Sequence, residues 1–158
     1  MAEMTDPHTS LVGFQKALDT YGISPSKCSL HSDLSELSDS AGGEPRLTFA
    51  LIKNGIAKGI VIYVAAPSLD GIRCLSIGYA VAEQFRNQGV AKEIIEKSLE
   101  QLSFTFKGKI PRFYVEAIID KTNIASRKVA LKVLSDSPTP ITEKISNKPA
   151  YRYVRLVE

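Results

Sequence analysis

Apolar residues recur along the chain at spacings that distinguish helices from strands. Ser10 can cap a helix, and apolar residues follow it at intervals of three and four until Gly22, which predicts a first amphipathic helix. Residues 24–46 then break this pattern, because serine recurs throughout the segment and two glycines close it. We expect mostly loop here, with at most one short helix around Leu34 and Leu37.

Two runs rich in β-forming residues follow, residues 47–52 and 56–65. Asn54-Gly55 separates them, and this dipeptide is the one best suited to a two-residue type I′ turn, so the pattern predicts a β-hairpin. The next run, residues 74–81, is apolar almost throughout, which is typical of a strand buried on both faces. We therefore expect a central strand there.

The rest of the chain alternates between helical and strand periods. Apolar positions from 90 to 102 mark one face of a helix, residues 113–119 read as a strand, and residues 123–134 read as another helix. Two strands joined through a helix should be parallel, so one βαβ crossover is expected. Residues 141–145 and 151–157 predict a second hairpin. The fold class is thus α/β (α+β), with a mixed sheet that is antiparallel at its ends.

Composition fits one globular domain over residues 1–158, with 44% hydrophobic and 23% charged residues. The formal net charge is only +3, far from the excess needed to neutralise many phosphates on a duplex. The charge therefore argues against a nucleic-acid partner. It is sufficient for one phosphorylated small molecule.

The two cysteines, Cys28 and Cys74, form no CxxC motif and no dense framework, so we read them as reduced thiols of a reducing compartment. No apolar run reaches membrane length, and the first ten residues carry no secretion signal. We expect a cytoplasmic protein without a membrane partner. His8 and His31 have no second ligand at suitable spacing, so we expect no metal site.

The most informative segment is a glycine-containing turn between the central strand and the helix that follows. The first amides of a helix lack intrahelical acceptors, and its dipole is positive at that end, so these amides can bind a diphosphate. A glycine would let the backbone approach phosphates closely, and an arginine can add charge-assisted hydrogen bonds. The alternative to an anion-binding loop is that the glycine only marks the start of a surface helix. The expected loop comprises Arg86, Asn87, Gln88, Gly89, Val90 and Ala91.

In this context the sequence resembles the GNAT superfamily of acetyl-CoA-dependent N-acyltransferases. Arg86, Gly89 and Ala91 occupy the loop positions of that family, and Asn123 begins the next helix as it often does there. The resemblance extends over about residues 47–134. It implies a centrally splayed mixed sheet of about six or seven strands with helices on both faces, and acetyl-CoA as co-substrate.

The resemblance also implies an activity, the direct transfer of an acetyl group from acetyl-CoA to a primary amine of a protein or small molecule. The backbone of Val81 and Ala82 matches the strand segment that binds the pantetheine arm, and a nearby amide can stabilise the oxyanion. Asn123 and Ser126 match residues that contact the cofactor, although both could equally be helix caps. The acceptor amine is not identified, and a homodimer is left open.

For the catalytic base, the resemblance favours Glu116 on the strand before Asn123, with Glu83 at the mouth of the loop as second candidate. Either could be an ordinary solvated carboxylate. The family's usual acid is a tyrosine, and Ala130 stands at its position. This departure keeps open an alternative, a non-catalytic acyl-CoA sensor or interaction module. Four tyrosines could substitute as the acid: Tyr79, Tyr114, Tyr151 and Tyr153.

Overall fold

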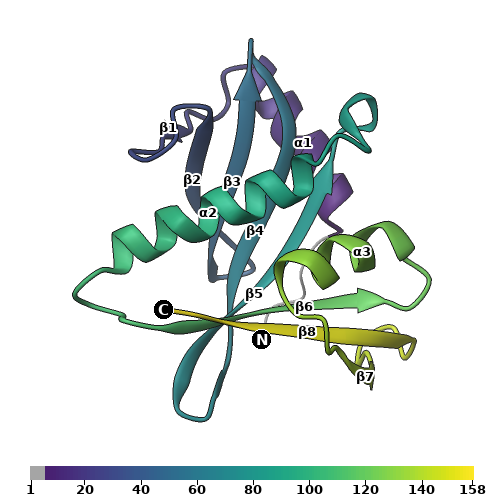
Figure 1. The fold of residues 1–158 in the computed structure, drawn as a ribbon. Coiled ribbons are helices and arrows are strands. Elements are labelled where there is room, and N and C mark those ends of the chain that lie inside the picture. The colour runs from purple at the N-terminus through teal and green to yellow at the C-terminus, as the bar shows by residue number, and fades with distance from the viewer. Residues whose placement is uncertain (1–5) are drawn as a thin grey trace.

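The computed structural model describes residues 6–158, which form one sheet with helices on both faces (Figure 1). The sheet has eight strands in the order β1-β2-β3-β4-β5-β6-β8-β7, slightly more than the expected six or seven. Every pair is antiparallel except β5 and β6. The expected mixed α/β architecture is confirmed. The elements are α1 (Pro7–Asp19), β1 (Ser26–Lys27), β2 (Leu34–Ala41), β3 (Glu44–Lys53), β4 (Ile56–Leu69), β5 (Ile72–Val81), the 3-10 helix η1 (Glu83–Phe85), α2 (Val90–Phe106), β6 (Phe113–Asp120), α3 (Ile124–Val133), β7 (Thr139–Thr142) and β8 (Pro149–Val157).

Helix α1 begins one turn earlier than its sequence pattern indicated. Asp6 is the N-cap, its carboxylate accepts a hydrogen bond from the Thr9 amide at 3.4 Å, and Pro7 occupies the first turn. Proline is favoured there because its missing N–H would have no partner. Ser10 therefore lies inside the helix, and the expectation that it caps α1 was wrong.

The segment 24–46 is not the expected loop, because it contains β1, β2 and the start of β3. β2 pairs with β3 along its whole length, from Leu34 opposite Leu51 to Ala41 opposite Glu44. Serine is a poor strand former, but strand propensity depends strongly on neighbouring strands and burial. Leu34 is fully buried in the core under α2, so tertiary pairing decides the structure here.

The hairpin of β3 and β4 is confirmed at its predicted turn. Lys53 and Ile56 form the last pair, and Asn54 and Gly55 both have positive φ, at 53° and 75°. A type I′ turn requires this conformation at both central residues. The second predicted hairpin is present as β7 and β8, with β7 ending at Thr142 rather than extending to residue 145.

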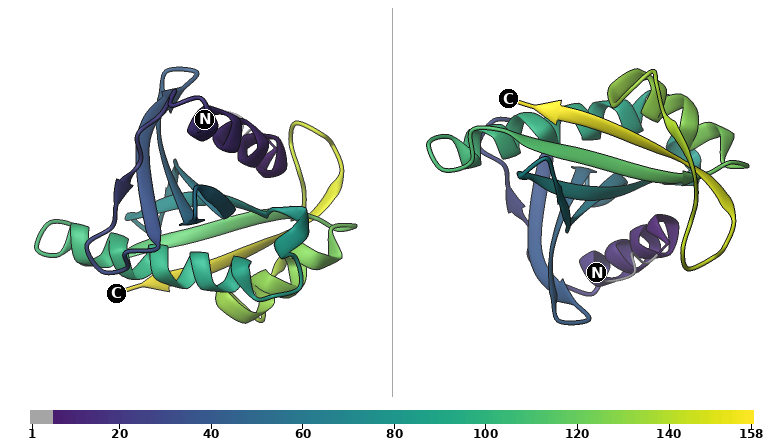
Figure 2. Two further views of the ribbon diagram at one scale, coloured as in Figure 1. Left: turned by 90° about the horizontal axis from the view of Figure 1, so that it is seen from above. Right: turned by 90° about the horizontal axis from the view of Figure 1, so that it is seen from below.

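The two faces of the sheet carry different helices, as Figure 2 shows from above and below. Helix α1 covers one face, where its Leu11 and Phe14 pack with buried residues of β3 and β4. Helices α2 and α3 cover the other face over a larger core. Of the helices described in residues 6–158, none has both the length and the apolar character needed to cross a membrane.

The sheet opens between its two central strands. β5 and β6 pair only over Cys74–Ser76 and Tyr114–Glu116, after which β5 runs on to Val81 and β6 to Asp120 without further pairing. β5 stays paired with β4 up to Val81, and β6 stays paired with β8 up to Asp120. Figure 1 shows the two strands diverging toward α3 and the start of α2. This divergence, called the splay below, confirms the expected centrally splayed sheet.

Candidate functional site

The loop between β5 and α2 presents a row of backbone donors. After η1 the chain passes through Asn87 and Gly89 with left-handed φ values of 62° and 76°, and α2 starts at Val90. The backbone amides of residues 87–92 donate no hydrogen bond to any group within residues 6–158. The first bonded amide of α2 is that of Glu93, which donates to the Gly89 carbonyl at 3.0 Å. Six unbonded amides at the positive end of a 17-residue helix form an anion-binding geometry.

Gly89 is required here by its backbone conformation. A Cβ at this position would meet no atom of the described chain within 4 Å, so the chain itself leaves room for a side chain. The φ of 76° is the constraint, because left-handed backbone is strained for residues with a Cβ. Asn87 has the same handedness, which asparagine tolerates better than most residues.

The polar side chains of the loop fold back onto it. Arg86 Nε lies 3.4 Å from the Val81 carbonyl, and Gln88 Nε2 lies 3.3 Å from the Gln84 carbonyl. The Arg86 side chain is exposed, so its terminal nitrogens remain free to contact a ligand. Arg86 therefore links the end of β5 to the mouth of the loop.

Val81 and Ala82, the expected contacts of the pantetheine arm, differ in availability. The Ala82 amide donates to the Lys58 carbonyl at 2.9 Å, so it faces β4. Successive residues of a strand direct their amides to opposite sides. The Val81 amide therefore points into the splay, where a donor for an oxyanion was expected.

Asn123 and Ser126 act as a helix cap in this structure. Asn123 precedes α3, and its Oδ1 accepts a hydrogen bond from the Ser126 amide at 3.2 Å. The Ser126 carbonyl accepts a second bond, from the Tyr79 hydroxyl at 2.6 Å. Because Tyr79 belongs to β5, this bond ties β5 to α3 across the splay. Contact of Asn123 or Ser126 with a cofactor stays a prediction.

The two carboxylates proposed as base lie in different surroundings. Glu83 is exposed in η1. Glu116 is 4% exposed, and its Oε2 accepts a hydrogen bond from Arg152 Nε at 2.7 Å. Its other oxygen, Oε1, accepts no hydrogen bond within the described residues, which leaves it available to a water molecule or an amine. Glu116 also belongs to the last residue pair before the splay opens.

The sequence pattern gave no indication of Arg152. It meets Glu116 because β8 runs antiparallel to β6, with Val154 opposite Glu116 and Arg152 opposite Ile118. Such diagonal neighbours across a strand pair are close enough for long side chains to touch. The register could not be read from the chain, since nothing in the sequence fixes how the C-terminal hairpin pairs with β6.

Two tyrosines lie on the other face of the splay, the partly buried Tyr79 and the fully buried Tyr153. Burial raises the pKa of Tyr79, and the nearby Tyr153 raises it further. Tyr153, on β8 opposite Ala117, is 0% exposed and packs in the core under α2 and α3. Its hydroxyl is a buried polar atom with no hydrogen-bond partner in the chain from residue 6 onward.

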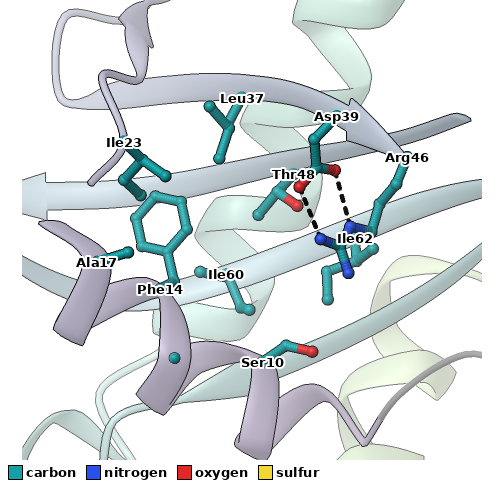
Figure 3. Close-up of a pocket in the computed structure, with 11 residues that line it drawn as sticks. Ser10, Phe14, Ala17, Ile23, Leu37, Asp39, Arg46, Thr48, Ile60 and Ile62 are labelled. Atoms are coloured by element: carbon teal, nitrogen blue, oxygen red, sulfur yellow. Dashed lines mark hydrogen bonds and ion pairs between the residues drawn. The ribbon is translucent and has the colours of Figure 1, made fainter. Parts of the chain in front are cut away.

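A cavity of about 250 Å³ lies on the face that α1 covers. Phe14, Ile60 and Ile62 give it apolar walls (Figure 3). Arg46 and Asp39 lie at one end, where Nε and a terminal nitrogen bond the two carboxylate oxygens at 2.8 and 2.6 Å. The hydrogen bond with Asp39 raises the pKa of Arg46, so the guanidinium stays charged. This face of the sheet is therefore hollowed.

The side chains of residues 6–158 bring together no group of three His, Cys, Asp or Glu that could hold a metal ion. Cys28 and Cys74 are free thiols. Burial, together with nearby Glu36 for Cys28 and Glu116 for Cys74, raises the pKa of each thiol to about 11. Neither thiol is ionised at neutral pH.

Comparison with known sequences identifies one family. The family model for the acetyltransferase (GNAT) domain matches residues 27–133, which is more than half of the chain. This match extends further toward the N-terminus than residue 47, where the sequence resemblance began. A sequence comparison with curated proteins finds no match.

Several solved structures share the fold at low identity. A GNAT-family acetyltransferase from Streptococcus pneumoniae is 16% identical, with a TM-score of 0.57 over 99% of this chain and 98% of that one. RimL, a ribosomal L7/L12 alpha-N-protein acetyltransferase, is 19% identical, with a TM-score of 0.53 over 71% of this chain and 70% of its own. The yncA protein of Salmonella typhimurium, solved with its cofactor acetyl-CoA, is 15% identical, with a TM-score of 0.51 over 73% and 66%.

Proposed function

The chain belongs to the GNAT acetyltransferase family, and on that premise we propose that it transfers an acetyl group from acetyl-CoA directly to a primary amine. The observation that carries this proposal is the row of six unbonded amides at the start of α2, next to the splay of β5 and β6. The amides bind the diphosphate of acetyl-CoA, and the splay receives its pantetheine arm. The yncA structure, solved with acetyl-CoA as its cofactor, supports this co-substrate.

Arg86 adds charge to the diphosphate site. Its exposed terminal nitrogens extend beyond the loop, while Nε stays against the Val81 carbonyl. Hydrogen bonds from an arginine to phosphate are roughly twice as strong as neutral ones. The Val81 amide, which points into the splay, donates to the thioester oxygen as that oxygen becomes an oxyanion.

The amine reaches the thioester from the face that α1 covers. Glu116 lies on that face at the start of the splay, and Arg152 holds its Oε2 in place. The free Oε1 accepts the proton that the amine loses as nitrogen attacks the carbonyl carbon. Glu116 is thus the proposed base, and the exposed Glu83 is the weaker candidate.

Direct transfer agrees with the state of the two thiols. A covalent acyl-enzyme requires a reactive thiolate or a comparable nucleophile. Cys74 is the cysteine nearest to the base, yet it is 1% exposed, and its pKa is raised to about 11 by burial and by Glu116. The buried, free cysteines also agree with a cytoplasmic location.

The acceptor is proposed only as a primary amine. RimL is an alpha-N-protein acetyltransferase, so a protein amine is one acceptor class compatible with this fold. A small-molecule amine is the other. A broad panel of amines and peptides, with release of the CoA thiol as the readout, distinguishes an enzyme from a protein that only binds acyl-CoA. Thiol release that depends on the amine excludes a pure binder.

Calorimetry with acetyl-CoA tests the cofactor site. We expect Gly89→Glu to abolish binding, because it brings bulk and negative charge to the amides. Gly108→Glu is the matched control, since Gly108 also has a positive φ, at 84°, and open space for a Cβ, but lies beyond the far end of α2. Both variants carry the same backbone strain. Equal affinity in the two variants, or no heat with the native protein, would refute the proposed function.

A further inference from the structure

The cavity between α1 and the sheet is walled partly by residues that precede the family match. Phe14, Ala17 and Ile23 line it from the N-terminal segment, whereas the family model matches only from residue 27. The opposite wall belongs to the sheet, where Ile60 and Ile62 are almost fully buried (Figure 3). The cavity therefore depends on this chain's own N-terminal segment, and it can set a specificity that the family match does not define.

The size and the walls of the cavity suit a single apolar group. Its volume of about 250 Å³ lies below the roughly 300–1,000 Å³ that is typical of sites for whole small molecules. A group of the size of a leucine side chain leaves water on entering such apolar surroundings, which favours its binding. The cavity is therefore suited to one part of a larger acceptor.

One end of the cavity carries an ion pair whose charges cancel. Arg46 bonds both carboxylate oxygens of Asp39 through Nε and one terminal nitrogen, and its other terminal nitrogen donates no hydrogen bond within residues 6–158. The side chains of Arg46 and Asp39 are 27% and 36% exposed, so this end is open to solvent. Arg46 can therefore donate to a neutral oxygen such as a carbonyl, while the paired Asp39 carboxylate attracts a cation only weakly.

The open end of the cavity lies in line with the proposed base. Arg46 is paired with Val64 of β4, which is paired with Ser76 of β5. Ser76 is in turn the partner of Glu116. Paired residues share a face of the sheet, and Val64 packs with the residues under α1. Because neighbouring strands lie ~4.8 Å apart, the backbones of Arg46 and Glu116 are roughly 14 Å apart on this face. An acceptor that spans them is elongated.

We propose that the acceptor is the N-terminal segment of a peptide, with its α-amine at Glu116, an apolar side chain in the cavity and a backbone carbonyl on Arg46. This inference rests on the proposed function, because it names the substrate class of the same site. Ile62 of the cavity wall lies two strands from β6, roughly 10 Å away. An extended peptide advances roughly 3.3–3.6 Å per residue, so its second or third side chain reaches the cavity.

The transfer balances in atoms and charge with this acceptor. The α-amine nitrogen forms a bond to the acetyl carbon and gives one proton to Glu116. The carbon–sulfur bond breaks, and its electron pair stays on sulfur as a thiolate. Glu116 returns its proton to solvent, which protonates the thiolate, so the net change moves one proton from nitrogen to sulfur.

A polyamine fits this face less well than a peptide does. The far end of a polyamine is an ammonium, which loses hydration in an apolar cavity. The carboxylate at the mouth of the cavity, Asp39, is already paired with Arg46 and offers no free negative charge. The acceptor face therefore favours an uncharged, apolar chain beyond the amine.

Thiol release with matched acceptors tests the preference. The native protein and acetyl-CoA receive Ala-Leu-Leu-Ala amide, Ala-Ser-Ser-Ala amide or spermidine, and the two peptides have the same length and charge. We expect kcat/KM for the leucine peptide to exceed that for each of the other two at least about tenfold, because filling an apolar pocket contributes on that scale. Equal or higher kcat/KM with the serine peptide or with spermidine would overturn the inference.

Two variants of α1 locate the preference in the cavity. Ala17→Leu enlarges a lining side chain, so it should remove the preference for the leucine peptide. Val12→Leu is the matched control, because it places a leucine on the exposed face of the same helix, where Val12 is 58% exposed. It should keep the native preference. Calorimetry should show native affinity for acetyl-CoA in both variants, which verifies that both are folded.

Arg46→Met tests the polar end of the cavity. The change leaves the Asp39 carboxylate unpaired, so kcat/KM for spermidine should rise relative to that for the leucine peptide. Loss of a partly exposed ion pair has little effect on stability, so the variant should fold. An unchanged ratio would show that Arg46 has only a structural role and would contradict its contact with the acceptor.

The outcomes separate this inference from the proposed function. If no amine of any kind releases the CoA thiol, the proposed function fails and the inference fails with it. If amines are acetylated but the peptides are not, or if Ala17→Leu keeps the leucine preference, the inference fails while the proposed function stands.

Discussion

At the scale of single residues, two positions set the geometry of the candidate site. Gly89 allows the turn that presents the amides, and Arg152 positions the Glu116 carboxylate. The sequence alone indicated Gly89, because a glycine in the turn between a strand and a helix is a local signal for an anion-binding loop. It suggested Glu116 only through family resemblance, and it could not reveal that Arg152 is its partner, since that contact depends on the register of β6 and β8.

Replacing the proposed base tests whether Glu116 accepts the proton of the amine without taking part in binding acetyl-CoA. Glu116→Gln keeps an oxygen that can accept the Arg152 hydrogen bond but cannot accept a proton. We expect kcat to fall by at least about 100-fold, with acetyl-CoA affinity unchanged in calorimetry. Steady-state kinetics with saturating donor give the measurement.

Glu83→Gln is the matched control for this change, because Glu83 is an exposed carboxylate in η1 at the mouth of the loop. It should retain the native kcat. The opposite result, with Glu83→Gln inactive and Glu116→Gln active, would show that Glu83 is the base. Glu116 would then have only a structural role, in its ion pair with Arg152.

At the scale of elements, some helices and turns follow from short sequence patterns, whereas other elements form only through tertiary pairing and burial. The Asn54-Gly55 turn, the amphipathic α2 and the Asn123 cap all follow from short sequence patterns, and the structure has each of them. β2 could not be predicted in this way, because its serines favour loops and only pairing with β3 and burial of Leu34 make it a strand. The start of α1 also has a local signal, Asp6-Pro7, because aspartate is a favoured N-cap and proline is favoured in the first turn of a helix.

Helix α1 offers a stability test of one element. Gly13 lies in its interior, and a Cβ there would meet no described atom within 4 Å. Gly13→Ala should raise the free energy of unfolding by roughly 0.5–1 kcal/mol, because alanine loses less backbone freedom in a helix. Urea unfolding measures the change.

The same glycine-to-alanine change at Gly108 should have the opposite sign, since its φ of 84° strains any residue with a Cβ. A decrease in stability for both variants would show that α1 does not tolerate a methyl group at position 13, and hence that its packing on the sheet is tighter than the structure shows.

At the scale of the whole molecule, the splay divides the sheet into β1–β5 on one side and β6–β8 on the other. Within the sheet formed by residues 6–158 the two parts share only three residue pairs, and the core under α2 and α3 joins them. The family resemblance predicted this opening, while periodicity alone predicted only the parallel pair. No short pattern marks where two neighbouring strands stop pairing, because that depends on the whole sheet.

A ligand that fills the splay should stabilise the whole fold. At a free concentration of about 100 times its Kd, acetyl-CoA contributes roughly 2.7 kcal/mol by mass action. For a chain of this size the melting temperature should rise by roughly 5–10 °C. Scanning calorimetry measures the shift, and Gly89→Glu should remove it. A shift that survives in Gly89→Glu would place the ligand somewhere other than the α2 loop.

The tyrosines around the splay have a further, optical consequence. The chain contains six tyrosines and no tryptophan, so its ultraviolet emission comes from phenols alone. Tyr79 and Tyr153 flank the splay, and the emission of a phenol changes when its hydroxyl gains an acceptor. The unlabelled protein thus carries its own fluorescent reporter at the splay, and stopped-flow recording of that signal can follow the arrival of acetyl-CoA.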